Sequence, residues 1–462
     1  MLFSAPIFLF FFLPLAVLLY QAVPKPWRNA TILAISIAFY GWAEPRFVFV
    51  ILGLSVLDYL LGMVIVQGGR RGRICLGIGI LSNISLLFAF KYLDFTFQNL
   101  VNLLGPLPQL NWLLPLGISF IVFEKITYLV DIHRGTGKPA RTIWDYLLFV
   151  FLFPKMLAGP IIKYREMEPF LRERSETVDD LIWGFRRFLW GLSKKVLVAD
   201  VAGEVADAVF GLPSGQIGFA GAWIGVIAFT VQIYFDFSGY SDMAIGIARM
   251  FGFRLRENFD HPYGSASFTE FWRRWHISLS TWIRDYLYIP LGGSRYGAVR
   301  TYANLWVCFL LSGLWHGANW NFVLWGAYNG FFLIADRLFW LRIADRLPRV
   351  LAVGVTLFFI MAGWTIFRAT SVPQMNEILL ALVSPWQTGA FVWVQPHQYV
   401  ALAFGFLGSL AAATGTGRAL VDGVERHPAW RSLAVLPLMA LSTLAVLKAL
   451  TVTFNPFLYF RF

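Results

Sequence analysis

Two histidines, His276 and His316, are the residues of this sequence best placed to do chemistry. His316 lies in the largely apolar stretch Leu311-Ser-Gly-Leu-Trp-His-Gly, and His276 lies in the basic, aromatic stretch Trp272-Arg-Arg-Trp-His-Ile-Ser. A titratable ring among residues expected at membrane depth is costly to bury, so it is a functional candidate by default. His316 is therefore a candidate for a site. His276 is a candidate for a different reason, since its charged neighbours indicate that it is not buried in hydrocarbon.

The chemistry expected of His316 is that of a general base. Desolvation favours the neutral ring, and a neutral imidazole can accept the proton of a hydroxyl nucleophile. If the local backbone is helical, Ser312 and Asn319 share the face of His316 and supply polar groups. The alternative is a histidine that only packs between helices and bonds to a carbonyl group, and the residues alone leave both interpretations open.

His276 lies among charged side chains, namely Arg273, Arg274, Arg284, Arg295 and Asp285. One interpretation is a contact zone for lipid headgroups, where arginine and tryptophan are both common. The other is an anion pocket, because arginine binds phosphate through a bidentate fork. Coenzyme A would bring such phosphates, together with an adenine ring that can stack.

Two carboxylates, Asp236 and Asp242, fall within one predicted membrane segment. We expect each to form an ion pair with an arginine, such as Arg273 or Arg274, that braces the core. A proton relay in a transporter is the competing interpretation. Two further charges in a predicted span are expected to pair locally or with a neighbouring helix: Glu124 and Lys125.

The composition predicts an all-α, polytopic integral membrane protein. Of the 462 residues, 58% are hydrophobic and 14% are charged, against roughly 25% charged in soluble domains. Apolar runs of about 20 residues recur along the chain and predict roughly 10–12 transmembrane helices. We attribute the net charge of +12 to cytoplasmic loops and anionic lipid, not to nucleic acid. The two cysteines imply neither a disulfide framework nor a metal site.

The predicted spans belong to a single membrane domain over residues 1–462. Basic loops at 24–28, 67–73 and 133–141 favour a cytoplasmic location for these loops and an N-terminus outside. The spans are expected near 2–23, 29–43, 46–66, 74–92, 112–132, 217–251, 301–312, 318–336, 350–369, 397–417 and 432–453.

Other segments are too polar or too interrupted to span. Residues 93–111 and 163–180 are expected to be loops. Residues 143–200 and 254–300 are expected to contain re-entrant or interfacial pieces, because prolines and charges interrupt them. The segment Gly313-Leu-Trp-His-Gly is expected to bend the chain near the middle of the bilayer. The remaining histidines are expected in loops or at span ends: His133, His261, His397 and His427.

Several long motifs resemble the membrane-bound O-acyltransferase family, and within it the alginate O-acetyltransferase branch. The resemblance places His316 at the family's catalytic histidine and His276 at its second, more variable polar residue. The motifs are Tyr234-Phe-Asp-Phe-Ser-Gly-Tyr-Ser-Asp-Met-Ala-Ile-Gly246, Asn258-Phe-Asp-His-Pro-Tyr263, residues 271–293, Ser312-Gly-Leu-Trp-His-Gly-Ala-Asn-Trp320, Ala158-Gly-Pro-Ile161 and residues 455–462.

The resemblance implies a fold and a reaction. The expected fold is a ring of helices around a thin core, with the catalytic histidine in a central tunnel. The expected donor is cytoplasmic acetyl-CoA, with no permanently bound cofactor and no metal. The expected acceptor is a secreted polysaccharide, alginate or another exopolysaccharide, reached through a periplasmic partner like an SGNH hydrolase. The expected location is the bacterial inner membrane.

With acetyl-CoA as donor, further residues acquire expected roles. Arg273, Arg274 and Arg284 would face the coenzyme A phosphates. Trp320 and Asn319 would shape the pocket and orient the ring of His316. Two alternatives stay open: transfer of D-alanine or another acyl group to a cell-wall polymer, and transport or lipid flipping without acyl transfer.

Overall fold

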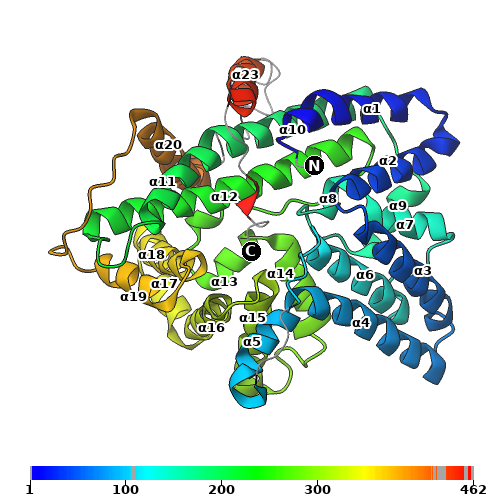
Figure 1. Ribbon diagram of the computed structural model, residues 1–462, viewed down its shortest axis with the longest axis horizontal. Coiled ribbons are helices and arrows are strands. Elements are labelled where there is room, and N and C mark those ends of the chain that lie inside the picture. Colours follow the sequence, from blue (N-terminus) through cyan, green and yellow to red (C-terminus); the bar gives the residue numbers. More distant parts are fainter. Residues whose placement is uncertain are drawn as a thin grey trace. The chain divides into compact units, whose positions relative to one another are not determined.

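The computed structural model describes residues 3–105, 110–417, 419, 423, 433–451 and 456–458, and these residues form helices and connecting segments without a strand (Figure 1). They form two compact units, Met1–Phe188 with Ser241–Arg256 and Leu189–Tyr240 with Glu257–Phe462. Two helices, α10 and α12, have residues in both units. A single membrane domain therefore stays a prediction.

The first unit consists mainly of the N-terminal helices. Within it, α4 lies beside α3 and α6, and α2 lies beside α7 (Figure 1). The helices are α1 (Leu13–Ala22), α2 (Arg28–Ala43), α3 (Phe47–Ile65), α4 (Gly69–Lys91), α5 (Leu93–Leu104), α6 (Ile118–His133), α7 (Ile143–Phe151), α8 (Phe153–Met156), α9 (Tyr164–Arg172) and most of α10 (Val178–Ser193).

The second unit contains both candidate histidines. Its helices α15 and α16 pack as a hairpin, and α18 packs against α16 (Figure 1). The helices are α11 (Asp200–Phe210), most of α12 (Phe219–Met250), α13 (Phe268–Arg274), α14 (Ile277–Ile283), α15 (Gly297–His316), α16 (Trp320–Ala335), α17 (Leu341–Ala344), α18 (Arg349–Arg368), α19 (Val372–Ala381), α20 (Pro396–Ala413) and α23 (Val435–Thr451).

Short π-helical and 3-10 turns join these helices. They are Phe8–Phe12, Lys25–Trp27, Lys194–Ala199, Pro262–Gly264, Arg284–Tyr288 and Asp336–Trp340.

The observed helices agree closely with the predicted spans. Among the described residues, four are long and apolar enough to cross a membrane by length and composition: α3, α4, α12 and α18. Their burial differs, since 17% of the apolar window of α4 is buried against 67% of that of α12. A lipid-facing helix and a core helix are expected to differ in this way. Shorter apolar helices, such as the 16-residue α2, rise only about 24 Å, so the predicted number of spans stays a prediction.

Two segments predicted to be loops contain helices. Residues 93–111 contain α5, and the carboxylate of Asp94 in its first turn accepts hydrogen bonds of 2.9 Å from the amides of Leu110 and Asn111. Residues 163–180 contain α9, which buries Tyr164, Met167 and Leu171 on one face. Both helices are too short to cross a membrane, so the sequence contains no apolar run of spanning length that would indicate them.

The charges predicted to pair inside the first unit do pair, with neighbouring helices. Glu124 of α6 forms a salt bridge with Lys155 of α8, and Lys125 of α6 lies 3.2 Å from Asp58 of α3. All four side chains are buried. Buried charges are tolerated when they are paired in this way, so these residues brace the packing of α3, α6 and α8.

The predicted bend over Gly313–Gly317 is confirmed at the C-terminal end of that segment. Helix α15 continues through Gly313 to His316, and the chain turns only at Gly317–Asn319. Gly313 instead permits close helix packing, because a Cβ there would clash with the carbonyl oxygen of Phe322. Gly326 on α16 meets α15 in the same way, at the carbonyl oxygen of Phe309. Small residues allow two backbones to approach closely inside a membrane.

Candidate active site

His276 has an unusual backbone conformation. It lies between α13 and α14 with φ 45° and ψ 53°, in the left-handed region. Such a conformation is uncommon for a residue other than glycine and persists only where surrounding contacts enforce it. Here the amide of Ile277, the next residue, donates to the carbonyl oxygen of Asn258 over 3.0 Å. Backbone strain of this kind clusters at functional sites.

The side chain of Asn258 determines which nitrogen of His276 carries the proton. Its Oδ1 accepts a hydrogen bond from the backbone amide of Ser278 at 3.1 Å, and it also lies 3.2 Å from Nδ1 of His276. The bond from the amide of Ser278 identifies this atom of Asn258 as the oxygen of its side-chain amide, which only accepts hydrogen bonds. Nδ1 of His276 must therefore carry the proton and donate to it, and the lone pair lies on Nε2. Burial lowers the pKa of His276 to about 3, so the ring is neutral.

His316 is the last residue of α15, and aromatic rings surround it. Its ring centroid lies 5.0 Å from that of Trp325 on α16 and 5.3 Å from that of Phe367 on α18, both edge-on. The side chain is buried, with 6% of its surface exposed. Helix ends from α15, α16 and α18 thus enclose the imidazole in apolar surroundings.

The two histidines lie close to one another in the second unit. Trp315 connects them: its ring centroid lies 6.1 Å from that of His276 and 4.9 Å from that of His316. Phe237 on α12 contacts the ring of His276 edge-on at 4.6 Å. The structure therefore brings together two rings that lie far apart in the sequence, with one indole between them.

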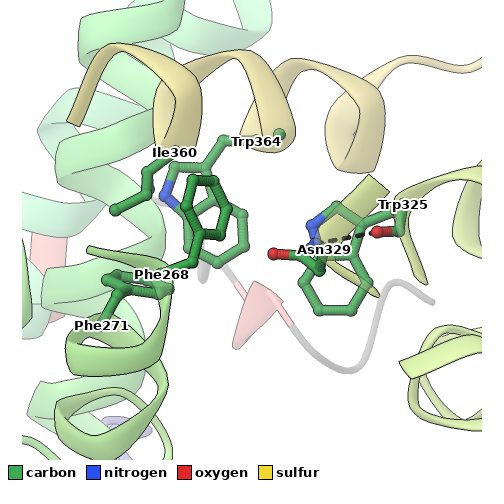
Figure 2. A pocket seen from close by; sticks show the side chains of 7 residues that line it. Phe268, Phe271, Trp325, Asn329, Ile360 and Trp364 are labelled. Atoms are coloured by element: carbon green, nitrogen blue, oxygen red, sulfur yellow. Dashed lines mark hydrogen bonds between the residues drawn. The ribbon is translucent and has the colours of Figure 1, made fainter. Parts of the chain in front are cut away.

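A cavity adjoins this aromatic cluster. It is small and lies between α13, α16 and α18. Trp325 borders both the cavity and His316. Figure 2 shows Asn329 with its amide nitrogen bonded to the carbonyl oxygen of Trp325, at 2.8 Å, and its amide oxygen turned toward the space. The lining residues are Phe268, Phe271, Trp325, Asn329, Ile360, Gly363 and Trp364.

The predicted donor-binding arginines lie at the exposed side of the same segment. Arg273 at the end of α13 is exposed, and the side chain of Arg284 is 59% exposed and pairs with Asp285 at 2.7 Å. Arg274 is partly buried and pairs with Glu270 at 2.7 Å, which Arg349 also contacts at 3.0 Å. Their role in donor binding stays a prediction.

Asn319 lies in the turn that follows His316, and Trp320 is the first residue of α16. Asn319 caps α16, with its Oδ1 accepting from the amide of Asn321 at 3.1 Å. The prediction that Asn319 shares a helical face with His316 is wrong, because α15 ends at His316. Ser312, one turn earlier, does lie on the same helix and is buried. Trp320 is 56% exposed.

Asp236 and Asp242 form bracing ion pairs as expected, but with other partners. Asp236 lies 2.8 Å from Nζ of Lys195, and Asp242 lies 2.7 Å from a guanidinium nitrogen of Arg187. Arg274 was excluded as a partner by its own pair with Glu270. The sequence could not reveal this choice, because it depends on which helices are neighbours in space.

Asp236 also binds the C-terminal segment. Its Oδ2 accepts from the amide of Leu458 at 2.7 Å, and the ring of Phe457 stacks on Tyr240 at 4.8 Å. Phe457 also contacts Phe237, the residue that touches His276. Of the C-terminal motif 455–462, only residues 456–458 are among those described.

The sequence did not single out several residues of this site. Asn258 lies in one of the motifs quoted above, and that motif is the signal that could have identified it. Trp364 and Phe367 lie in an uninterrupted apolar span. The sequence of such a span does not distinguish an aromatic ring that faces lipid from one that lines a site. Asn329 is a polar residue in such a span, and polarity at that depth is a usable signal.

The described residues form helices, and several of these helices are apolar enough to span a membrane. Two buried histidines lie in the second unit. These features define the class as a multi-pass helical membrane protein with a buried histidine site. The sequence profile of MBOAT, the membrane-bound O-acyltransferase family, matches residues 141–372. This chain belongs to the membrane-bound O-acyltransferase family, and it is an O-acyltransferase.

Individual relatives agree with this assignment. The chain is 37% identical to a Pseudomonas aeruginosa protein named "Probable alginate O-acetylase AlgI", over all of both chains. It is 42% identical to a protein of the same name from Azotobacter vinelandii, over 83% of this chain and 78% of the relative. It is 34% identical to the peptidoglycan O-acetyltransferase of Helicobacter pylori, over 83% of this chain and 80% of the relative.

Proposed function

We propose that this protein is an O-acetyltransferase that moves an acetyl group from cytoplasmic acetyl-CoA across the membrane toward a secreted polysaccharide. The family and the names of the relatives support acetyl transfer to a polymer. The observation that carries the proposal is that both His316 and His276 are buried and that the indole of Trp315 lies near each ring.

His316 acts as the general base in this proposal. Its neutral ring takes the proton of an acceptor hydroxyl, whose oxygen attacks the thioester carbonyl carbon. The C–O bond forms, the C–S bond breaks, and coenzyme A leaves as the thiol after it receives the proton. The aromatic rings of Trp325 and Phe367 exclude water and so limit hydrolysis of the thioester.

The donor side is formed by His276 and its arginines. Nδ1 of His276 is held by Asn258, and this contact fixes the orientation of the ring. The exposed guanidinium groups of Arg273 and Arg284, with Arg274 behind them, face the coenzyme A phosphates. Trp320 and Asn319 shape the pocket after His316.

The final acceptor is alginate or another exopolysaccharide, and an SGNH-hydrolase-like acetyltransferase on the periplasmic side passes the acetyl group on to it. The protein lies in the bacterial inner membrane with its N-terminus outside. Four apolar helices of spanning length support the membrane location.

Proteoliposomes test the reaction itself. Acetyl-CoA labelled in the acetyl group is added on the side of the basic loops, and a soluble polysaccharide with the SGNH-like partner is placed on the other side. The proposal predicts labelled ester on the far side together with stoichiometric free coenzyme A. Label that appears only when D-alanine on a carrier protein replaces acetyl-CoA would contradict it, and so would polymer uptake without release of coenzyme A.

A second experiment tests the arginines. Acetyl-pantetheine carries the same thioester as acetyl-CoA but lacks the phosphates and adenine. The wild-type enzyme should favour acetyl-CoA by kcat/KM, and Arg273→Ala with Arg284→Ala should remove this preference while leaving transfer from acetyl-pantetheine unchanged. Lys138→Ala, in a basic loop of the first unit, is the matched control and should keep the preference. An undiminished preference in the double variant would exclude these arginines from donor binding.

A further inference from the structure

A loop between α19 and α20 exposes three large aromatic side chains. Trp386 is 79% exposed, Phe391 83% and Trp393 71%. The rings of Phe391 and Trp393 lie 6.1 Å apart. We call residues 384–395 the aromatic loop. An exposed cluster of large apolar side chains marks an interaction surface more often than a single exposed residue does.

Backbone contacts fix the shape of the aromatic loop. The amide of Phe219 donates to the carbonyl oxygen of Gln387 at 2.9 Å, and the amide of Ala390 donates to that of Gln216 at 2.8 Å. A Cβ at Gly218 would lie 2.5 Å from the amide nitrogen of Gly389, so only glycine permits this approach. The backbone of the loop is thus attached at its centre to the start of α12.

The same contacts place the loop at the ends of apolar helices. The uncharged part of α12, Phe219–Phe235, begins at the residue that bonds to Gln387. The uncharged part of α18 ends before Arg368, which pairs with Asp207 at 2.6 Å. Helix α20 begins immediately after the loop, at Pro396. The end of an apolar span marks the boundary between hydrocarbon and water.

The charge of the segment selects among partners. Residues 378–417 contain no aspartate, glutamate, lysine or arginine. Two carboxylates lie beside it, and both accept hydrogen bonds within the protein: Glu377 from the amide of Gly215 at 2.8 Å and Glu204 from the side chain of Gln398 at 3.0 Å. The segment itself therefore contributes no charge with which a polysaccharide, a lipid phosphate or a protein could form an ion pair. Tryptophan is enriched at membrane interfaces, because an indole combines an apolar body with one polar N–H group.

We propose that the aromatic loop inserts into the headgroup region of the bilayer leaflet in which α12 begins, the outer leaflet in the predicted topology. It anchors the second unit there by burial of Trp386, Phe391 and Trp393, independently of lipid charge. The partner is the lipid interface itself.

An environment-sensitive dye tests this insertion. NBD is attached to Phe391→Cys in full-length protein that also carries Cys75→Ala and Cys308→Ala, and transfer activity confirms folding. Leu81→Cys, on the exposed face of α4, serves as the lipid-contacting control. Lys138→Cys, in an exposed basic loop, serves as the water-exposed control.

In phosphatidylcholine vesicles, NBD at position 391 should emit at a shorter wavelength than NBD at position 138. Lipids that carry a doxyl group near the headgroup should quench the emission from position 391. Addition of anionic lipid should not change the shift. Emission equal to that of position 138 would overturn the proposal. A shift that appears only with anionic lipid, or only when the SGNH-like partner is added, would overturn it as well.

Discussion

Two buried polar regions of this protein are built in opposite ways. In the first unit, α6 carries two adjacent charges, and each pairs with an opposite charge: Glu124 with Lys155 and Lys125 with Asp58. In the second unit, aromatic rings contact His276 and His316, and the side chains of Asn258 and Ser278 lie 3.2 and 3.5 Å from Nδ1 of His276.

This difference distinguishes residues that stabilise the fold from residues that could take part in the reaction. In a buried ion pair each charge is compensated by its partner, so removal of one partner leaves an uncompensated buried charge and costs stability. A neutral imidazole held by an amide keeps one nitrogen able to accept a proton. We therefore expect substitutions in the first region to change stability and those in the second to change the rate of transfer.

The largest expected effect is on the ion pair of α6. Lys155→Met leaves the buried carboxylate of Glu124 without its partner and should destabilise the protein by about 3–5 kcal/mol. The measurement is thermal unfolding in detergent. The double variant Glu124→Gln with Lys155→Met restores neutrality and should recover most of the loss. Equal unfolding temperatures for the single variant and the wild type would show that the pair braces nothing.

The next effect concerns two asparagines that play opposite roles. Asn258→Ala removes the acceptor that orients the ring of His276, and it should lower kcat by roughly 10- to 100-fold, the usual cost of losing such a supporting hydrogen bond. Asn83→Ala removes a donor to Asp58 in the first unit. It should lower the unfolding temperature and leave kcat unchanged once folded protein is counted. A similar loss of kcat in both variants would erase the contrast between the regions.

Asp236 belongs to both kinds of region, since it pairs with Lys195 and also holds the C-terminal segment. Asp236→Asn keeps an oxygen that can accept from the amide of Leu458 but removes the charge. Lys195 retains Asp200 at 2.6 Å, so we expect a loss of stability of only about 1–2 kcal/mol. Comparison of unfolding temperature with kcat shows which role dominates. A fall in kcat without a change in stability would assign Asp236 to the histidine site.

The smallest effect belongs to the partly exposed pair at Glu270. Burial alone would raise the pKa of Glu270, but a hydrogen bond from the amide of Ala266 and the guanidinium groups of Arg349 and Arg274 lower it below its ordinary value. Its contribution to stability is therefore present above the unfolded pKa and is lost as pH falls through the folded pKa. It should amount to less than about 1 kcal/mol.

Thermal unfolding of Glu270→Gln and wild type, at about pH 6 and about pH 4, measures this contribution. The wild type should lose more stability than the variant on acidification. Identical losses in the two proteins would show that the lowered pKa has no consequence for folding.

The sequence predicted the apolar helices well, because length and hydrophobicity decide them locally. It also selected His316, since a titratable ring stands out in apolar surroundings, and His276, since it lies among arginines. It did not predict that His276 is buried, with 1% of its surface exposed, because its sequence neighbours are charged. It did not predict the partners of Asp236 and Asp242, which depend on contacts between helices remote in sequence. It also missed α5 and α9, whose short amphipathic patterns resemble loops when spans are sought by length. The aromatic rings of α18 gave no signal at all, because phenylalanine and tryptophan are ordinary residues of a membrane span.

The most direct test of the account is the rate of acetyl transfer from labelled acetyl-CoA by His316→Ala in proteoliposomes, normalised to folded protein. The exposed His397→Ala serves as control. A general base contributes typically about 10²- to 10⁴-fold, so His316→Ala should lose at least about 10²-fold while His397→Ala keeps the wild-type rate. Transfer by His316→Ala at the wild-type rate would contradict the account.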